Sequence, residues 1–267
     1  MAYNARMSTK ILGAALIVPL TLGVSGCASE LSSGEKTDEE VVTGTNNTPP
    51  KETKNEEGST PRGTSDNLGE QKTPDFVTSS RGVSVTDSQK LKKDAKDVYI
   101  YFDFACPDCH EYELKHGEEY RKQVENGDIN LILVPIPFLD QYTVDNYATR
   151  ASSAFLTLAE HDPQVAYKFY QLAYDKEHYP EEGPKHKPTT TDQLVSWARE
   201  AGADNVLAEK FYENTYYDWV HESADIVEQD KVIFPDGVST PTIVKGGSRD
   251  DSGKMVKDSG YEIVDEG

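Results

Sequence analysis

The chain has 267 residues, with 27 Lys and Arg against 47 Asp and Glu, for a formal net charge of −20. This length allows one large domain or two small ones. The acidic balance argues against nucleic-acid binding, because such a surface repels a phosphate backbone. Hydrophobic residues make up only 36% of the chain, so we expect part of it not to fold. Three cysteines cannot build a scaffold of several disulfides, so each needs its own explanation.

Residues 1–26 have the pattern of an export signal. Positive residues near the start precede sixteen residues, 11–26, that carry no charge. This stretch is shorter than the roughly 20 apolar residues of a membrane-spanning helix. It leads into Val-Ser-Gly-Cys at 24–27, which resembles the bacterial lipobox, in which the cysteine is lipidated and becomes the new N-terminus. The alternative is an ordinary signal peptide with an unrelated cysteine. We expect a lipid on Cys27, anchoring the protein to the cell membrane on its extracytoplasmic face.

The segment 27–80 is rich in Ser, Thr, Gly, Pro, Glu and Lys. From residue 28 onward it has only seven aliphatic or aromatic side chains: Ala28, Leu31, Val41, Val42, Leu68, Phe76 and Val77. So few apolar groups cannot offset the chain entropy lost on folding. The composition therefore predicts a disordered acidic tether over 27–80 and a folded domain over 81–267.

The folded domain opens with a short predicted strand, Val83–Thr86, and then a strong one, Val98–Phe104, rich in β-branched and aromatic residues. The second strand leads directly into Cys106-Pro107-Asp108-Cys109. The pattern then becomes helical, with Pro107 suited to the first turn and Asn126-Gly127 to the stop. Another strand is predicted over Ile129–Phe138. The cysteine pair therefore lies at a junction between a strand and a helix.

This position gives the two cysteines different roles. Two thiols separated by two residues can close a small disulfide ring with little strain. The first thiol lies at the positive end of the helix dipole, close to unpaired backbone N–H groups. Both effects favour the thiolate, which is the reactive species in disulfide exchange. We therefore expect Cys106 to be the nucleophile and Cys109 to resolve the mixed disulfide.

Three other interpretations of the pair stay open at this point. A zinc site needs four ligands, and the chain has no second cysteine pair. The string C-x-x-C-H, completed by His110, also matches the attachment motif of c-type haem, for which Met255 is a candidate axial ligand. A purely structural disulfide is the third. The long apolar strand before the motif favours thiol redox chemistry, in which His110 is either a solvated helix residue or an aid to thiolate chemistry.

The run from Val98 to Cys109, together with Thr240-Pro241-Thr242-Ile243-Val244, resembles the DsbA-like disulfide oxidoreductases of the thioredoxin superfamily. In that family a cis proline faces the cysteines, and the backbone around it binds the substrate peptide. Pro241 matches this proline, and Thr240 the residue before it. The resemblance implies an α/β thioredoxin-like fold with an inserted helical domain, here about 141–232.

The intervening sequence has the helical pattern that such an insertion requires. One helix is expected over Asn146–Glu160 and another after the cap Asp162-Pro163. A third opens at Thr190 or Thr191 and closes near Gly202, and Asp204 caps a long helix that runs through Ile226. Five aromatic residues here are candidates for a peptide groove, although their spacing is more typical of a core: Phe211, Tyr212, Tyr216, Tyr217 and Trp219.

Two positions depart from the family pattern. Thioredoxin-like proteins often hold a buried, proton-transferring acid six residues before the first cysteine, and this position is Ile100 here. The nearest strand acid, Asp103, falls on the opposite face by alternation, which puts the buried proton relay in doubt. Between the cysteines, Asp108 stands where strongly oxidising members carry histidine. Its charge should raise the pKa of Cys106 relative to a histidine and make the disulfide a moderate oxidant.

The resemblance implies an extracytoplasmic thiol-disulfide oxidoreductase without a bound cofactor. We expect it to act as an oxidase on exported cysteine-containing proteins and to need a membrane redox partner. A reductase or isomerase of the same fold is the runner-up. Outside enzymology, the alternatives are a haem-carrying electron-transfer lipoprotein and a solute-binding lipoprotein. The C-terminal residues suggest a hairpin around Met255-Val256 and Tyr261–Val264, without the terminal helix expected of the family.

Overall fold

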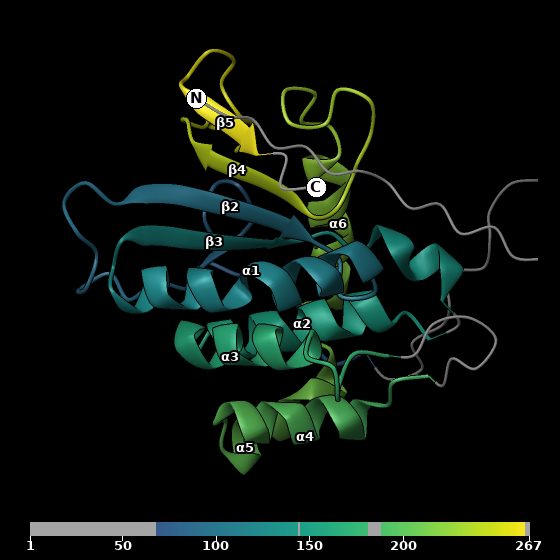
Figure 1. The fold of residues 1–267 in the computed structure, drawn as a ribbon. Coiled ribbons are helices and arrows are strands. Elements are labelled where there is room, and N and C mark those ends of the chain that lie inside the picture. The colour runs from purple at the N-terminus through teal and green to yellow at the C-terminus, as the bar shows by residue number, and fades with distance from the viewer. Residues whose placement is uncertain (1–67, 144, 181–187, 265–267) are drawn as a thin grey trace, which may run out of the picture. The chain divides into compact units, whose positions relative to one another are not determined.

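The structure, a computed structural model, describes residues 68–143, 145–180 and 188–264. The predicted export signal, Cys27 and the predicted tether as far as residue 67 lie outside the described residues. The described part combines a five-stranded sheet with helices on both of its faces (Figure 1). Among these residues, no helix is both long and apolar enough to cross a membrane.

The sheet has the strand order β1-β3-β2-β4-β5. Its strands are β1 (Val83–Ser84), β2 (Lys96–Phe102), β3 (Ile129–Pro135), β4 (Thr242–Gly246) and β5 (Tyr261–Val264). β2 and β3 are parallel, and the other neighbours are antiparallel. In the register, Ile100 lies between Leu133 of β3 and Ile243 of β4. The central β2 therefore places its carboxyl end, where the cysteine motif begins, beside the start of β4.

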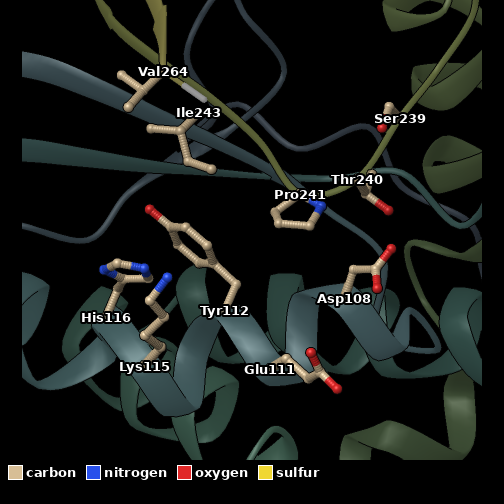
Figure 2. Close-up of a pocket in the computed structure, with 10 residues that line it drawn as sticks. All are labelled: Asp108, Glu111, Tyr112, Lys115, His116, Ser239, Thr240, Pro241, Ile243 and Val264. Carbon is tan, nitrogen blue, oxygen red and sulfur yellow. The ribbon is translucent and has the colours of Figure 1, made fainter. Parts of the chain in front are cut away.

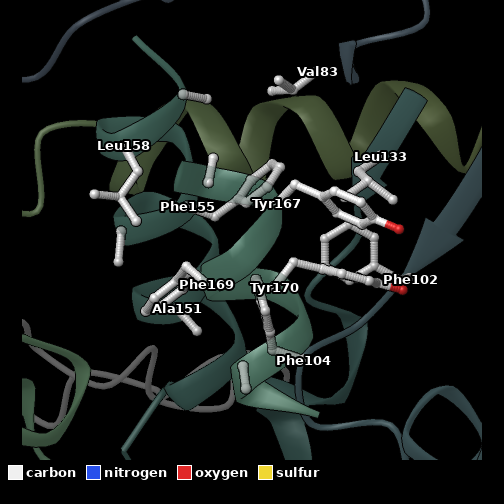
Figure 3. Packing of buried hydrophobic residues seen from close by; sticks show 14 of the residues in the cluster. Val83, Phe102, Phe104, Leu133, Ala151, Phe155, Leu158, Tyr167, Phe169 and Tyr170 are labelled. Atoms are coloured by element: carbon white, nitrogen blue, oxygen red, sulfur yellow. The ribbon is translucent and has the colours of Figure 1, made fainter. Parts of the chain in front are cut away.

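Both faces of the central strands are buried, which explains why β2 and β3 read as nearly continuous apolar runs. Alternate residues of β2 face opposite ways: Ile100 and Phe102 pack with the helices on the α1 side, and Tyr99 and Tyr101 pack with Phe234 on the other. The α1 side holds a dense aromatic cluster (Figure 3). In it, the Phe102 ring lies 5.0 Å from Phe104 and 4.9 Å from Tyr170, both edge to face.

The helices agree with most of the sequence predictions. They are α1 (Pro107–Glu125), α2 (Tyr147–Ala159), α3 (Pro163–Ala173), α4 (Thr191–Ala201), α5 (Asn205–Glu209) and α6 (Tyr217–Val227), with 3₁₀ segments η1 (Phe138–Tyr142) and η3 (Lys210–Glu213). The Asp162 side chain caps α3, Thr190 forms a capping box on α4, and Gly202 ends α4 at a φ of 109°. The helices α2 to α6 lie in the chain between β3 and β4, where the insertion was expected.

The long helix predicted from Asp204 through Ile226 is wrong. Asp204 caps only the short α5, which passes into η3 and stops at Asn214, whose φ is 47°. This left-handed residue cannot continue a helix, so α6 starts anew after it. Of the five aromatic residues in this region only Tyr212 is exposed, at 47%, so the set belongs mainly to the core.

The predicted end of the tether at residue 80 is also wrong, because residues 68–80 make specific contacts with the folded part. The backbone N–H of Gly69 donates to the carbonyl of Glu213 at 2.7 Å, and that of Lys72 to Thr215 at 2.9 Å. The Phe76 ring packs edge to face on Tyr216 at 5.8 Å. Backbone hydrogen bonds and one aromatic anchor are contacts that composition alone does not reveal.

Of the two strands predicted for a C-terminal hairpin, only the second forms, and it pairs with β4. Tyr261–Val264 is β5, and it pairs with β4 rather than with Met255-Val256. Met255 instead forms an isolated bridge with Arg249, and its side chain is buried. As far as Val264, where the described residues end, no helix follows α6.

Candidate active site

The cysteine pair lies where β2 ends and α1 begins, as predicted. Cys106 is the N-cap of α1, with Pro107 in the first turn. Its backbone N–H donates to the Asp103 carbonyl at 2.9 Å, and its carbonyl accepts from the N–H of His110 at 3.1 Å. Both thiols are free, and the residues are almost fully buried, with exposures of 3% for Cys106 and 1% for Cys109.

The two thiols have opposite acidities. The pKa of Cys106 is lowered to about 6, chiefly because the Cys109 thiol donates a hydrogen bond to its sulfur, with help from the Thr240 side chain and the backbone N–H groups of Cys109 and Asp108. Burial works against this shift and raises the pKa of Cys109 well above its ordinary value. Near neutral pH, the reduced site therefore pairs a thiolate at Cys106 with a thiol at Cys109. This is the asymmetry that a nucleophile and a resolving thiol require.

The Thr240–Pro241 segment faces the cysteines, as the resemblance implied. The peptide bond between them is cis, and the thiol of Cys106 donates to the Thr240 carbonyl at 3.2 Å. The two residues are 134 positions apart in the chain. The pairing of β2 with β4 brings them together, because the motif follows the end of β2 and Pro241 directly precedes β4.

The alternation that put the buried proton relay in doubt does not apply to Asp103. The strand ends at Phe102, so alternation no longer governs Asp103, which turns inward and is 1% exposed. Its carboxylate accepts from the backbone N–H groups of Ala105 and Leu139, each at 2.8 Å. Burial nevertheless raises its pKa to about 8. A buried carboxyl therefore does stand next to the dithiol, three residues before Cys106.

A second buried acid, Glu113, was missed by the sequence reasoning. It lies on α1 four residues after Cys109, and burial raises its pKa to about 7, against hydrogen bonds from the side chains of Gln171 and Tyr170. A Cβ at Gly117, one further turn along, would fall 2.2 Å from its carboxylate oxygen. The spacing of Cys109, Glu113 and Gly117 at i, i+4 and i+8 was the available signal.

His110 is neither solvated nor isolated. Its Nδ1 lies 2.7 Å from the carbonyl of Tyr174, and its ring stacks on Tyr179 at 4.1 Å. The hydroxyl of Tyr179 donates to the Ala105 carbonyl at 3.0 Å, and that of Tyr174 to the Asp103 carbonyl at 2.6 Å. Residues from the inserted helical region thus hold both the loop before Cys106 and the first turn after it.

A groove of about 360 Å³ lies between α1 and the segment around Pro241 (Figure 2). One wall is α1, with Asp108, Glu111, Tyr112, Lys115 and His116, and the other is the segment from Thr240 through Pro241 to Ile243. Asp108 is exposed, and its side chain lies at the end of the groove nearest Thr240. Over the described ranges, no three His, Cys, Asp or Glu side chains gather in a way that could hold a metal ion.

Fold and site together define a thiol-disulfide oxidoreductase: a parallel β2–α1–β3 unit, a dithiol at the start of α1 and a cis proline opposite it. A family model described as thioredoxin matches residues 92–258, and the chain belongs to this family. The predicted thioredoxin-like fold with a DsbA-like helical insertion is confirmed.

Three solved structures illustrate the likeness. MdbA from Corynebacterium diphtheriae, a thiol-disulfide oxidoreductase, is 26% identical, with a TM-score of 0.52 over 70% of this chain and 91% of its own. MdbA from Corynebacterium matruchotii is 25% identical, with a TM-score of 0.53 over 68% and 85%. DsbA from Mycobacterium tuberculosis, at 24% identity, has a TM-score of 0.54 over 66% and 85%, which shows the fold alone. The search of curated proteins finds no match.

Proposed function

We propose that the protein oxidises exported proteins by transferring the Cys106–Cys109 disulfide to their cysteine pairs. The observation that carries this proposal is the lowered pKa of Cys106, to about 6, opposite the Thr240 carbonyl. A thiol with this pKa is ionised about ten to one at pH 7. Stabilising the thiolate stabilises the reduced protein, and this makes the disulfide form a better oxidant.

The transfer takes two exchange steps. A substrate thiolate attacks the Cys106 sulfur, the bond to Cys109 breaks, and Cys109 leaves as a thiolate that takes up a proton. The second substrate thiolate then attacks the substrate sulfur of the mixed disulfide, and Cys106 leaves as a stable thiolate. The substrate loses two electrons and gains a disulfide, while the protein ends reduced. The candidate proton carriers for Cys109 are two buried acids with raised pKa: Asp103, next to the pair, and Glu113, one helical turn after Cys109 on α1.

The backbone at Thr240 is the proposed docking point for the substrate. Its carbonyl oxygen lies 3.2 Å from the Cys106 sulfur, so it lies within reach of a peptide bound through the same sulfur. An extended peptide beside Thr240-Pro241 would pair with it in the manner of an added strand. A membrane redox partner would then remove the two electrons and restore the disulfide.

The location of the protein is part of the proposal. The Val-Ser-Gly-Cys sequence at 24–27 supports a lipid on Cys27 after export, which would hold the catalytic domain at the outer side of the cell membrane. Mass spectrometry of the mature N-terminus tests this. We expect a chain that begins at Cys27 and carries a diacylglyceryl mass, and an unmodified thiol there would refute the anchor.

The oxidase function is tested by mixing the oxidised protein with a reduced peptide that contains a cysteine pair. We expect peptide disulfide to form in step with the loss of the Cys106–Cys109 disulfide. Cys106→Ser should abolish the reaction. Cys109→Ser, mixed instead with the disulfide form of the peptide, should form a mixed disulfide through Cys106, with the second peptide sulfur leaving as a thiolate. Transfer that survives without Cys106 would contradict the assignment.

A further inference from the structure

We propose that Tyr179 is a positioning residue of the dithiol, which joins the two ends of the Cys106–Cys109 motif and so holds the two sulfurs in the geometry that disulfide exchange requires. Tyr179 lies in the turn after α3, 74 positions beyond Ala105, the residue that precedes the motif. The inference deepens the proposed function, and it rests on that function only in taking Cys106 and Cys109 as the reacting pair.

The peptide unit that leads into Cys106 is held at both of its polar groups. Its carbonyl, which belongs to Ala105, accepts a hydrogen bond from the Tyr179 hydroxyl at 3.0 Å. Its N–H, which belongs to Cys106, donates to the Asp103 carbonyl at 2.9 Å, and the hydroxyl of Tyr174 donates to the same carbonyl at 2.6 Å. Because a peptide unit is planar, fixing both groups restricts the directions in which the Cys106 side chain can leave the backbone.

The other end of the motif contacts the same tyrosine. The ring of His110, the residue after Cys109, stacks on the Tyr179 ring with 4.1 Å between centroids and 9° between planes. Its Nδ1 lies 2.7 Å from the Tyr174 carbonyl, and because a carbonyl only accepts, Nδ1 carries the proton. The stack and the hydrogen bond together fix the position and the rotation of the imidazole. A movement of the first turn of α1 would therefore also displace Tyr179.

These contacts close a ring that runs from Ala105 through the motif to His110 and returns through Tyr179. The two sulfurs must part and meet again as the disulfide breaks and forms. The hydrogen bond from the Cys109 thiol to the Cys106 sulfur depends on their separation, as does the attack of Cys109 on a mixed disulfide. By spanning both ends of the motif, Tyr179 limits how far this separation can change.

The turn that carries Tyr179 is itself anchored to the inserted helices. The Asp175 carboxylate accepts from the backbone N–H of His178 at 2.9 Å. The His178 ring lies edge to face on Trp197 of α4 at 5.3 Å, and its Nε2 lies 3.2 Å from the Glu200 carboxylate. A residue can position a reacting group only if its own surroundings hold it, and these contacts meet that condition.

The test measures the acidity of Cys106 in the reduced full chain, from the pH dependence of its alkylation by iodoacetamide. Tyr179→Phe keeps the ring that stacks on His110 and removes the hydroxyl that holds the Ala105 carbonyl. We expect the ratio of thiolate to thiol at Cys106 to fall about threefold to tenfold at a given pH, which raises its pKa by about 0.5 to 1. This is the effect expected for losing one hydrogen bond of ordinary strength.

The matched control is Tyr212→Phe, which removes the hydroxyl of an exposed tyrosine in the same inserted region, where it bonds to Asp192. The free energy of unfolding of both variants is measured in the disulfide form, because a merely structural role for Tyr179 would lower it and leave the acidity of Cys106 unchanged. An unchanged acidity in Tyr179→Phe, or an equal change in Tyr212→Phe, would overturn the proposal. No substrate enters these measurements, so their failure is distinct from a failure of the oxidase assay.

Discussion

At the scale of single residues, the site depends on an unequal pair of sulfurs next to the buried carboxyl of Asp103. Cys106 is made acidic by donors around its sulfur, whereas burial keeps Cys109 protonated. The cysteine motif and the Thr-Pro step were identifiable from the sequence, because they are short patterns with a chemical reason. The buried position of Asp103 was not identifiable from the sequence. The direction of its side chain depends on where β2 ends, and the alternation of side chains along a strand stops at that point.

The acidity of Cys106 predicts how the reduction potential of the pair changes with pH. Below about pH 6, reduction takes up two protons with two electrons, so the potential falls by about 59 mV per pH unit. Above the pKa of Cys106 only Cys109 takes up a proton, and the slope halves to about 30 mV. Equilibration with glutathione from pH 5 to 8 measures this. A single slope of about 59 mV up to pH 8 would mean that Cys106 is not ionised.

The charge between the cysteines predicts the effect of Asp108→His. Removing a carboxylate from beside the Cys106 thiolate and placing an imidazole there should stabilise the reduced form. We expect the reduction potential to rise by about 30 to 60 mV, which corresponds to a tenfold to hundredfold change in the exchange equilibrium. Asp108→Asn, which removes only the negative charge, should give a smaller rise. An unchanged potential in both variants would refute this account.

Asp103 predicts a pH dependence of stability in the disulfide form, in which neither cysteine titrates. Its pKa is raised from 3.8 to about 8, so between these values the folded protein holds a proton that the unfolded chain has lost. The free energy of unfolding therefore falls as pH rises from about 4 to 8. Asp103→Asn should reduce the fall between pH 5 and 8 by about 2 to 4 kcal/mol in urea denaturation. Glu113→Gln is the control, because it keeps the contribution of Asp103. Equal pH profiles for wild type and Asp103→Asn would contradict the prediction.

At the scale of elements, the inserted helices do more than cover the sheet. The turn after α3 carries Tyr174 and Tyr179, whose hydroxyls donate to backbone carbonyls before Cys106, and the Tyr174 carbonyl lies 2.7 Å from Nδ1 of His110. The helix boundaries with polar caps were predictable, as Asp162 and Thr190 show. The break in the helix at Asn214 was not predictable. The apolar pattern of the sequence continues through this residue, and only its left-handed backbone conformation reveals the break.

The tyrosine contacts predict a difference between buried and exposed hydroxyls. Tyr174→Phe removes a buried hydrogen bond to the Asp103 carbonyl and should lower the free energy of unfolding by about 1 to 2 kcal/mol. Tyr212→Phe removes an exposed hydrogen bond to Asp192 and should cost less than about 0.5 kcal/mol. Urea denaturation of the two variants measures both values. Equal losses of unfolding free energy in the two variants would mean that the buried hydrogen bond from Tyr174 adds no more stability than the exposed one from Tyr212.

At the scale of the whole molecule, the chain combines a thioredoxin-family domain with an acidic N-terminal segment. The strand order was not predicted, since no periodicity in the sequence indicates which strands are neighbours. Residues 68–80 joined the folded part unexpectedly, because backbone hydrogen bonds such as that from Gly69 leave no trace in composition. The excess of acids over bases is a property of the whole chain.

The most direct test of the oxidase proposal is the equilibrium reduction potential of the Cys106–Cys109 couple at pH 7. The lowered pKa of Cys106 stabilises the reduced form, and Asp108 limits this effect. We therefore expect a value between about −220 and −130 mV, more oxidising than thioredoxin at about −270 mV and less so than the strongest oxidants of this fold at about −120 mV. A value at or below about −270 mV would contradict the proposal and assign the protein to reduction.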